Sequence, residues 1–363
     1  MLMTEPHNRK QVVVVGGGIS GLSAAFYLKS ALKHRHLEAD IQIVEKSDLF
    51  GGKIHTLHRD GFVIEQGPDS FLARKLPMIE LTRDLGLTGE LTGTNPKANK
   101  TYIVHKGQLH RMPPGLNLGV PTQLKPFFKT GLISPFGKAR AALDLFKSAR
   151  KETGDEAVGQ FFERRLGKEV LEHIAEPILA GIYAGDTYNL SLEATFPQFH
   201  QAEQKYGSLI KGMMASKQNP PPPSPLSELI PAHARSSVFL TYKKGLVTVL
   251  GGLREALEDT TDINAEVSSM RLEGDRYELL LNDGEMLQAD AVILALPAFA
   301  MAPLLDRLEE ARWLNEMEYV SVANVVLAFD KSALSHPLDG SGFVIPRTEG
   351  RFITACTWTS SKW

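Results

Sequence analysis

The feature that most constrains the fold is a glycine-rich turn directly after a β-branched run. Val12 to Val15 is followed by Gly16-Gly17-Gly18-Ile19-Ser20-Gly21, and the apolar stretch Leu22 to Leu28 comes next. A β-like run that changes at glycines to a helical pattern predicts a strand, a tight turn and a helix. In this context the glycines match the GxGxxG fingerprint of a dinucleotide-binding βαβ unit. The ordinary alternative is a glycine-rich turn that binds nothing.

Each glycine of the fingerprint has a physical role. Gly16 permits the tight turn, Gly18 lets the backbone approach a pyrophosphate, and Gly21 lets the helix pack close to its strand. The N–H groups at the start of the helix face the phosphates, and the helix dipole favours their negative charge. Glu45 ends a second β-like run, where its carboxylate can accept hydrogen bonds from a ribose diol.

The glycines do not distinguish NAD from FAD, because both cofactors use this fold. Glu45-Lys46-Ser47-Asp48-Leu49-Phe50-Gly51-Gly52-Lys53 resembles the signature of the flavin monooxygenase and amine-oxidase-like superfamily. In that superfamily a second glycine pair lies beside the same diphosphate. The resemblance therefore implies FAD.

Later segments narrow the resemblance to one branch. Gly61 to Phe71 resembles the coproporphyrinogen and protoporphyrinogen oxidase family, in the form found in Gram-positive bacteria. The resemblance recurs at Glu176 to Asp186, at Leu246 to Leu250 and at Ala295 to Ala298, and Glu176 to Asp186 is its most specific part. It covers essentially the whole sequence.

The resemblance implies an enzyme of heme biosynthesis that oxidises a porphyrinogen to the aromatic porphyrin. Six electrons leave in three steps, each passing a hydride to flavin N5, and dioxygen reoxidises the flavin and becomes hydrogen peroxide. Coproporphyrinogen III is the expected substrate, and protoporphyrinogen IX is the alternative. Because the flavin supplies the chemistry, no catalytic side chain is assigned. An amine oxidase, a carotenoid desaturase and a flavin-free prenyl-protein escort are further alternatives.

Several more residues enter the predicted site. Lys46 follows Glu45, and Lys53 is expected near the flavin phosphates or ring edge, with a surface lysine as the alternative. Gly67-Pro68-Asp69-Ser70 is expected to present backbone N–H groups to the flavin, since Gly-Pro favours an exposed turn. By resemblance, the backbone of Val267 meets the adenine. The basic pair Arg74 and Lys75 can hold a substrate propionate; the alternative is a solvated helix face.

Composition excludes several other classes of function. The net charge of −2 over 363 residues gives no indication of a nucleic-acid partner. Cys356 is the only cysteine, so neither a disulfide nor a cysteine metal site is expected, and the eleven histidines show no metal-ligand spacing. We expect a cytoplasmic protein without a metal. Dioxygen and a small-molecule porphyrinogen are the expected partners, and the sequence leaves open a homo-oligomer.

The predicted fold class is α/β: a discontinuous Rossmann-like FAD-binding domain, a substrate domain of mixed sheet, and a helical insertion. The FAD-binding domain is assigned to residues 1–98 and 238–302, the helical insertion to 110–216, and the substrate domain to 217–237 and 303–363. Predicted elements include a hairpin at 101–109 turning at Lys106-Gly107, a polyproline-like linker at 218–225, a central parallel strand at 291–296 and strands at 263–267 and 320–329.

One basic segment allows two interpretations. Lysines and arginines between Lys125 and Lys151 alternate with leucines and phenylalanines between Leu124 and Phe146. The ordinary interpretation is an amphipathic helix packed on its own domain. The alternative is docking on an anionic membrane surface, at the inner face of the cell membrane. Members of the family continue beyond the last residue of this sequence, so we expect a C-terminally truncated fragment that lacks the last flavin contact.

Overall fold

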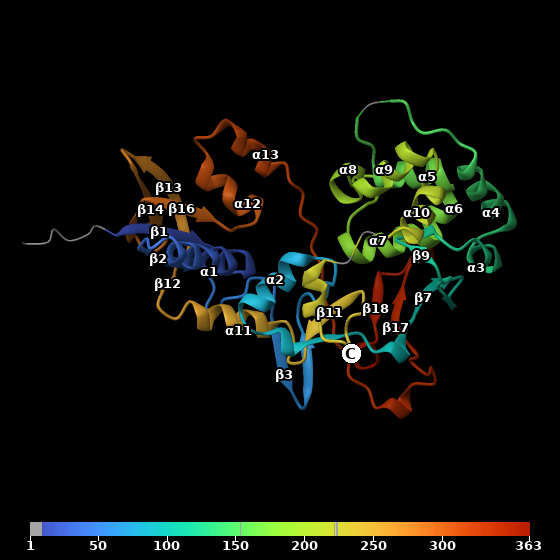
Figure 1. Cartoon of the computed structure of the whole chain (residues 1–363), viewed down its shortest axis with the longest axis horizontal. Helices are drawn as coiled ribbons and strands as arrows, with labels where there is room; N and C mark the ends of the chain where they lie inside the picture. The colour runs from blue at the N-terminus through green and yellow to red at the C-terminus, as the bar shows by residue number, and fades with distance from the viewer. Residues whose placement is uncertain (1–8, 153, 221, 223) are drawn as a thin grey trace, which may run out of the picture. The chain divides into compact units, whose positions relative to one another are not determined.

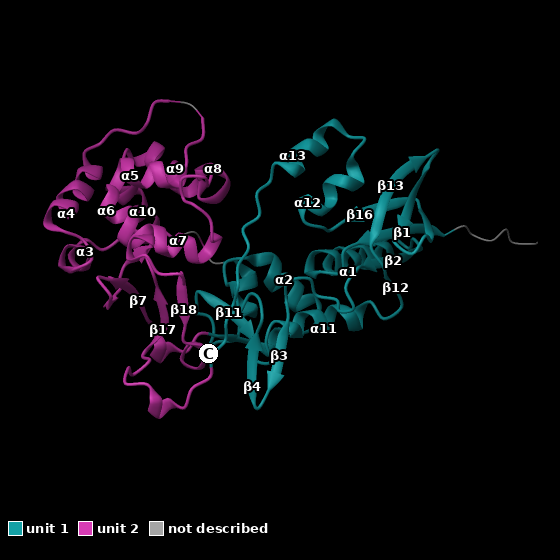
Figure 2. Ribbon diagram, turned by 180° about the vertical axis from the view of Figure 1, so that it is seen from behind, with its two compact units in different colours: residues 1–93, 224–327 teal, residues 94–223, 328–363 magenta. Residues whose placement is uncertain are grey.

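The computed structural model describes residues 9–152, 154–220, 222 and 224–363. The chain divides into two compact units, each built from two separate stretches of sequence (Figure 2). Unit 1 contains residues 1–93 and 224–327, and unit 2 contains residues 94–223 and 328–363. The functional division into FAD-binding, helical and substrate domains stays a prediction.

Unit 1 contains a four-stranded parallel sheet (Figure 1). Its strand order is β12-β2-β1-β16, with β12 at Thr261–Asn264, β2 at Ala39–Glu45, β1 at Lys10–Val15 and β16 at Ala291–Leu294. All three pairings are parallel, with Val13 of β1 opposite Gln42 and Val292. The predicted strand–turn–helix at the start of the chain is confirmed, because helix α1 (Ile19–His34) follows β1.

The alternating side chains of β1 enter two different cores, as expected for a strand buried on both faces. Val14 packs in a cluster with residues of α1 and of helix α11 (Val247–Ala256). Val13 and Val15 pack in a cluster with the antiparallel sheet β13-β14-β15. Unit 1 therefore has a helical layer, a parallel sheet and a second sheet, the layering that an α/β dinucleotide fold requires.

The remaining elements of unit 1 surround these layers. The strands are β3 (Thr56–Arg59), β4 (Phe62–Glu65), β5 (Phe71–Leu72), β6 (Leu91–Gly93), β11 (Phe239–Tyr242), β13 (Val267–Glu273), β14 (Arg276–Leu281) and β15 (Met286–Ala289). The helices are α2 (Leu76–Asp84), η1 (Thr88–Glu90), η5 (Pro225–Leu229), α12 (Ala298–Met301), η6 (Ala302–Leu305), η7 (Glu309–Ala311) and α13 (Arg312–Asn315).

Unit 2 packs a helical bundle against a four-stranded sheet of order β18-β17-β7-β8. The strands are β7 (Lys100–His105), β8 (Gln108–Arg111), β9 (Leu116–Asn117), β10 (Val120–Pro121), β17 (Gly340–Val344) and β18 (Ala355–Thr357). The helices are η2 (Pro96–Ala98), α3 (Leu124–Lys129), α4 (Pro135–Ala142), η3 (Leu143–Leu145), α5 (Val158–Leu166), α6 (Lys168–Val170), η4 (Leu171–Ala175), α7 (Glu176–Tyr183), α8 (Leu192–Thr195), α9 (Pro197–Tyr206), α10 (Leu209–Gln218), η8 (Lys331–Ala333), η9 (Arg347–Glu349) and α14 (Thr359–Lys362).

A buried ion network holds the helices of unit 2 together. Arg165 of α5 is fully buried, and its guanidinium contacts Asp144 at 2.5 Å and Glu203 at 3.2 Å. The second oxygen of Asp144 accepts hydrogen bonds from the Ser208 hydroxyl and the Ile210 N–H. Buried charges persist when they are paired, and in this network both carboxylates are paired with Arg165.

Three sequence predictions about strands differ from the structure. The strand at 291–296 is parallel to β1, as predicted, but it ends at Leu294 and lies at one end of the sheet order, so it is not central. The strand predicted at 263–267 is broken, because β12 ends at Asn264 and β13 begins at Val267 to join another sheet. Residues 320–329, all of them described, form no strand and pair with no neighbour; a strand needs a partner for its backbone groups.

Other predictions are confirmed or lie outside the described residues. Strands β7 and β8 form the predicted hairpin, with a turn at Lys106-Gly107. The polyproline-like linker at 218–225 includes Pro221 and Pro223, which lie outside the described residues. Among the residues that the structure does describe, no helix has both the length and the apolar character needed to cross a membrane.

Candidate dinucleotide-binding site

The turn between β1 and α1 requires glycine at its first position. Gly16 has φ +107°, in the left-handed region that favours glycine, and its N–H donates to the Val44 carbonyl at 2.8 Å. A Cβ at Gly16 would lie 2.5 Å from the Ala295 carbonyl oxygen. Three neighbouring strand ends therefore meet at this residue: β1 itself, β2 through Val44 and β16 through Ala295. Ligands of α/β sheets bind at such carboxyl ends of parallel strands.

Within the part of the chain that the structure describes, no side chain caps the start of helix α1. Gly18 is the N-cap and provides no side chain, and the first turn holds no acidic residue. Leu22 N–H makes the first hydrogen bond to the Gly18 carbonyl, at 3.0 Å, so the N–H groups of Ile19, Ser20 and Gly21 precede it. Such groups, together with the helix dipole, bind anions.

The second glycine pair lies against the first. Gly51 N–H donates to the Gly17 carbonyl at 2.9 Å, and Gly18 and Gly51 form a parallel bridge. A Cβ at Gly52 would lie 3.1 Å from the Gly18 Cα, so the two backbones approach without side chains between them. Two segments that are distant in the sequence thus form one glycine-lined wall, which we call the glycine cradle: Gly16 to Gly21 with Gly51 and Gly52.

Glu45 is held at the edge of the glycine cradle by hydrogen bonds. Its Oε2 accepts from the Gly17 N–H at 2.7 Å, and its Oε1 accepts from the Ser47 N–H at 2.9 Å and from the Ser47 hydroxyl at 2.6 Å. Partial burial opposes ionisation, but these hydrogen bonds hold the pKa of the Glu45 carboxyl below its ordinary value. The carboxylate is therefore ionised near neutral pH.

These residues fit a dinucleotide cofactor. The glycines let the two backbone segments pack closely beside the start of α1, which supplies donors for phosphate oxygens. A carboxylate has about four lone-pair sites, and three are used on Glu45, so Oε2 can still accept a hydroxyl hydrogen bond. The donor and acceptor pattern matches a phosphate next to a ribose.

The structure places the other predicted cofactor residues near this edge with different partners. Lys46 forms an exposed ion pair with Glu266 at 3.5 Å. Gly67 packs on the Lys53 backbone, where a Cβ would meet the Lys53 carbonyl oxygen at 2.2 Å. Gly67 and Pro68 are exposed, and within the same loop the Ser70 hydroxyl donates to Asp69 at 2.6 Å.

Val267 follows the strand that borders Glu45. Asn264 of β12 pairs with Glu45, and the Ala265 N–H donates to the Glu45 carbonyl at 3.1 Å. Val267 comes two residues later, as the first residue of β13, and its side chain is buried. Its backbone is therefore kept close to the end of β2, on the side where Glu45 lies.

The predicted substrate residues are exposed at the start of α2. Lys75 is the N-cap of α2, its N–H donates to the Leu72 carbonyl at 2.9 Å, and both Arg74 and Lys75 are exposed. Among the described residues, no hydrogen bond or ion pair joins either side chain to the glycine cradle. Their role in substrate binding stays a prediction.

Sequence reasoning missed three residues that shape the site. Ser47 fixes the Glu45 carboxylate, and the Asn264 side chain donates to the Glu45 and Ser47 carbonyls at 3.2 and 2.8 Å. The Phe50 ring lies where a Cβ on Gly17 would be, with the Arg254 guanidinium 4.2 Å from its centroid. Ser47, two residues after Glu45, has the spacing of a local turn; no sequence signal identified Phe50 or Asn264.

The basic segment of unit 2 exposes aromatic residues. Helix α3 and the loop after it bury Phe127 and Leu132, but Phe128, Phe136 and Phe146 are exposed by 43%, 80% and 85%. Lys125 and Lys129 are exposed beside Phe128 in sequence. Lys147 has a different role, because its ammonium donates to the Arg164 carbonyl at 2.8 Å. We call Phe128, Phe136 and Phe146 the aromatic face.

Within the described residues, no cluster of histidine, cysteine or acidic side chains could hold a metal ion.

Comparison with known proteins agrees with the geometry of unit 1. Residues 19–358 match the family model described as flavin containing amine oxidoreductase. The chain is 42% identical to a coproporphyrinogen III oxidase of Bacillus subtilis and 39% identical to one of Staphylococcus aureus. Each alignment includes 98% of this chain, and it includes 74% of the Bacillus protein and 75% of the Staphylococcus protein.

A solved structure agrees along almost the whole chain. A candidate protoporphyrinogen oxidase from Exiguobacterium sp. 255-15 superimposes with a TM-score of 0.79 at 32% identity, over 98% of this chain and 74% of that one. The resemblance seen in the sequence motifs is confirmed by these matches, and so is the predicted fold class.

Proposed function

The chain belongs to the family of flavin-containing amine oxidoreductases, and on this premise we propose that it oxidises coproporphyrinogen III to coproporphyrin III with dioxygen as acceptor. FAD is its cofactor, as the family and the fit of the glycine cradle both indicate. The substrate is inferred from the similarity to the Bacillus and Staphylococcus coproporphyrinogen III oxidases. The proposed role is a step of heme biosynthesis.

The observation that carries the proposal is the closed glycine cradle with Glu45 at its edge. The N–H groups at the start of α1 would bind the pyrophosphate, and Glu45 would accept a ribose hydroxyl. Val267 would border the adenine with its backbone, and Lys53 with Gly67 to Ser70 would face the flavin end. The protein's contribution is to bind and orient the cofactor and to exclude competing reactions.

The reaction balances without a protein acid or base. When bound, FAD supplies the two-electron chemistry and transfers the electrons to dioxygen. Over three such oxidations the porphyrinogen loses six hydrogens, and three dioxygen molecules become three hydrogen peroxide molecules. No side chain is assigned a catalytic role for this reason.

A substrate comparison tests the proposal. The FAD-loaded chain is incubated in air with coproporphyrinogen III or with protoporphyrinogen IX, and porphyrin formation is followed by fluorescence. We expect a higher kcat/KM for coproporphyrinogen III, with turnover that stops when dioxygen is removed. Preference for protoporphyrinogen IX would refute the substrate while leaving the reaction class intact. No porphyrin from either substrate would refute the proposed activity.

Protoporphyrinogen IX is the second candidate substrate, because the similar structure from Exiguobacterium is described as a candidate protoporphyrinogen oxidase. The two substrates differ in charge: coproporphyrinogen III carries four propionates, and protoporphyrinogen IX carries two propionates and two vinyl groups. A site for the former should therefore offer more cationic donors. Arg74 and Lys75 are our candidates for these donors, since both are exposed in unit 1.

We also propose that unit 2 attaches peripherally to anionic membranes through its aromatic face. Exposed aromatic rings with lysines nearby bind such surfaces by burying apolar area and by charge attraction. Co-sedimentation with phosphatidylglycerol vesicles tests this, with Phe136→Ser and Phe146→Ser as variants and Phe352→Ser as control, because Phe352 is exposed in the same unit. The first two should bind less and the control as the parent does; equal binding by all would refute the aromatic face.

A further inference from the structure

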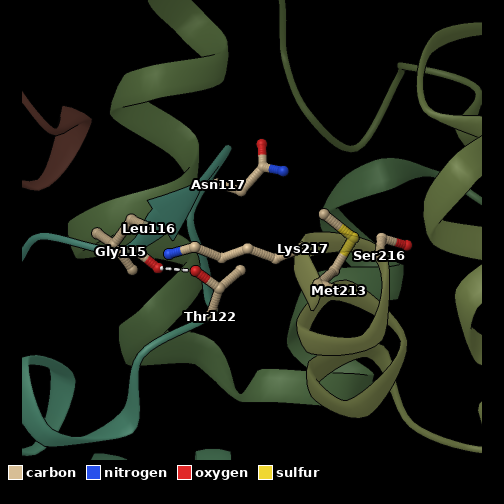
Figure 3. Close-up of a pocket in the computed structure, with 7 residues that line it drawn as sticks. All are labelled: Gly115, Leu116, Asn117, Thr122, Met213, Ser216 and Lys217. Atoms are coloured by element: carbon tan, nitrogen blue, oxygen red, sulfur yellow. Dashed lines mark hydrogen bonds between the residues drawn. The ribbon is translucent and has the colours of Figure 1, made fainter. Parts of the chain in front are cut away.

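Unit 2 contains a cavity that shares no residue with the glycine cradle (Figure 3). Its volume is about 310 Å³, and it is lined by Gly115, Leu116, Asn117, Thr122, Met213, Ser216 and Lys217. Small-molecule sites typically measure about 300–1,000 Å³, so this one lies at the lower end. A cavity of this size suits a slender ligand better than a four-ring macrocycle.

One wall of the cavity is held rigidly by a strained hairpin. Strands β9 and β10 are joined by Leu118 and Gly119, whose φ values are +49° and +87°. Leucine rarely adopts this backbone conformation, and a Cβ on Gly119 would lie 2.8 Å from the Ala175 Cα. Strain of this kind persists where the surroundings enforce it and is common at ligand sites. Leu116 and Asn117 are fixed by this hairpin.

The lining of the cavity contains both paired polar groups and apolar side chains. The Thr122 N–H and hydroxyl both donate to the Gly115 carbonyl, each at 2.7 Å, and this carbonyl has two lone pairs. Leu116 and the buried Met213 supply apolar surface. Methionine adapts its shape to apolar ligands. Leu116 and Met213 therefore provide a surface on which an apolar group can pack.

The lining also offers donors, and it includes no acidic side chain. Lys217 extends from α10 toward Gly115 and Thr122, and Ser216 comes from the same helix (Figure 3). The Asn117 amide comes from β9. A cation and two neutral donors around an apolar interior match an anionic oxygen head on a hydrocarbon tail.

We propose that this cavity binds a single-chain carboxylate such as a fatty acid, with the carboxylate at Lys217 and the chain along Leu116 and Met213. The lining includes none of the residues proposed to bind FAD or the porphyrinogen, so the proposal does not depend on the proposed substrate. Titration calorimetry with sodium decanoate is the direct test. Two control compounds separate the contributions: decan-1-ol has the same hydrocarbon tail without the negative charge, and inorganic phosphate has negative charge without the tail.

Two variants and a control locate the site. Lys217→Gln removes the cation, and Ser216→Trp fills the cavity without changing charge. Lys211→Gln makes the same charge change on the same helix outside the cavity. We expect decanoate to bind at one site per polypeptide chain. Decan-1-ol and phosphate should each bind at least tenfold more weakly than decanoate. Lys217→Gln should weaken decanoate about tenfold, since a charge-assisted contact is lost.

The cavity variants and the control should differ in decanoate binding. Ser216→Trp should abolish it, and Lys211→Gln should bind as the parent does. Absence of saturable binding to the parent, or equal weakening by Lys217→Gln and Lys211→Gln, would overturn the proposal. Circular dichroism reports whether Ser216→Trp folds; if it does not, the two lysine variants decide. Displacement of decanoate by coproporphyrin III would also overturn the single-chain assignment, because it would make the cavity a porphyrin site.

Discussion

Replacing Gly16 with alanine tests the turn on which the cofactor site depends. The added Cβ would lie 2.5 Å from the Ala295 carbonyl oxygen and 3.1 Å from its carbon. These are backbone atoms that follow β16, so they cannot rotate away as a side chain would. The backbone φ of +107° also disfavours any residue with a Cβ.

The expected cost has two parts. A non-glycine residue held at such a φ costs about 1–3 kcal/mol, and overpacking a close contact costs about 1–3 kcal/mol more. The sum, about 2–6 kcal/mol, is lower than the total stability of many domains, so part of the protein should remain folded. A displaced turn also misplaces donors at the start of α1. Losing two charge-assisted hydrogen bonds of about 1.5 kcal/mol each weakens FAD about a hundredfold.

The assay combines denaturant unfolding of the cofactor-free protein with fluorescence titration of FAD. The control is Gly251→Ala, because Gly251 lies in α11, its added Cβ meets nothing within 4 Å, and alanine favours a helix by about 0.5–1 kcal/mol. Gly251→Ala should be equally or more stable and bind FAD as the parent does. If Gly16→Ala has the same unfolding midpoint and the same FAD affinity as the parent, the close approach of Gly16 to Ala295 is wrong.

Three further predictions concern charged residues. Arg165→Met should lower the unfolding free energy by about 3–5 kcal/mol in denaturant titration, because Asp144 and Glu203 lose a buried partner; an unchanged midpoint would contradict the buried network. Burial opposes ionisation of Glu203, but the arginine side chains hold the pKa of its carboxyl below its ordinary value. The ionised carboxylate therefore adds to the unfolding free energy above the ordinary pKa, and this contribution is lost as the pH falls through the lowered pKa. In Glu203→Gln the unfolding free energy should therefore depend less on pH in that acid range. Arg74→Ala and Lys75→Ala should lower kcat/KM more for coproporphyrinogen III than for protoporphyrinogen IX, about tenfold, and equal losses on both substrates would show that these residues do not read the extra propionates.

The site could be predicted from sequence where its signal is local. Gly16 to Gly21 follow one strand and begin one helix, so spacing alone predicts the turn, and Glu45 ends the next strand. The contact between Gly17 and Gly51 joins distant segments, and only the family resemblance indicated it. Phe50 and Asn264 were missed because their roles depend on which backbone lies opposite them.

Strand predictions failed where pairing decides the outcome. Residues 320–329 have the composition of a strand, yet they have no neighbour with which to pair in the structure, since composition does not supply a partner. The strand predicted at 263–267 is divided because its two halves pair in different sheets, β12 with β2 and β13 with β14. The buried charges of Arg165 and Glu203 were likewise unpredicted, because charged residues are ordinarily exposed.

Titration of the cofactor-free chain with FAD and with NAD tests the central claim most directly, using the parent and Glu45→Ala. We expect the parent to bind one FAD per chain and NAD far more weakly. Glu45→Ala should remain folded, as circular dichroism would show, and bind FAD at least tenfold more weakly because the ribose loses its charged acceptor. Tighter binding of NAD than of FAD by the parent, or unchanged FAD binding by Glu45→Ala, would contradict the assignment of this site.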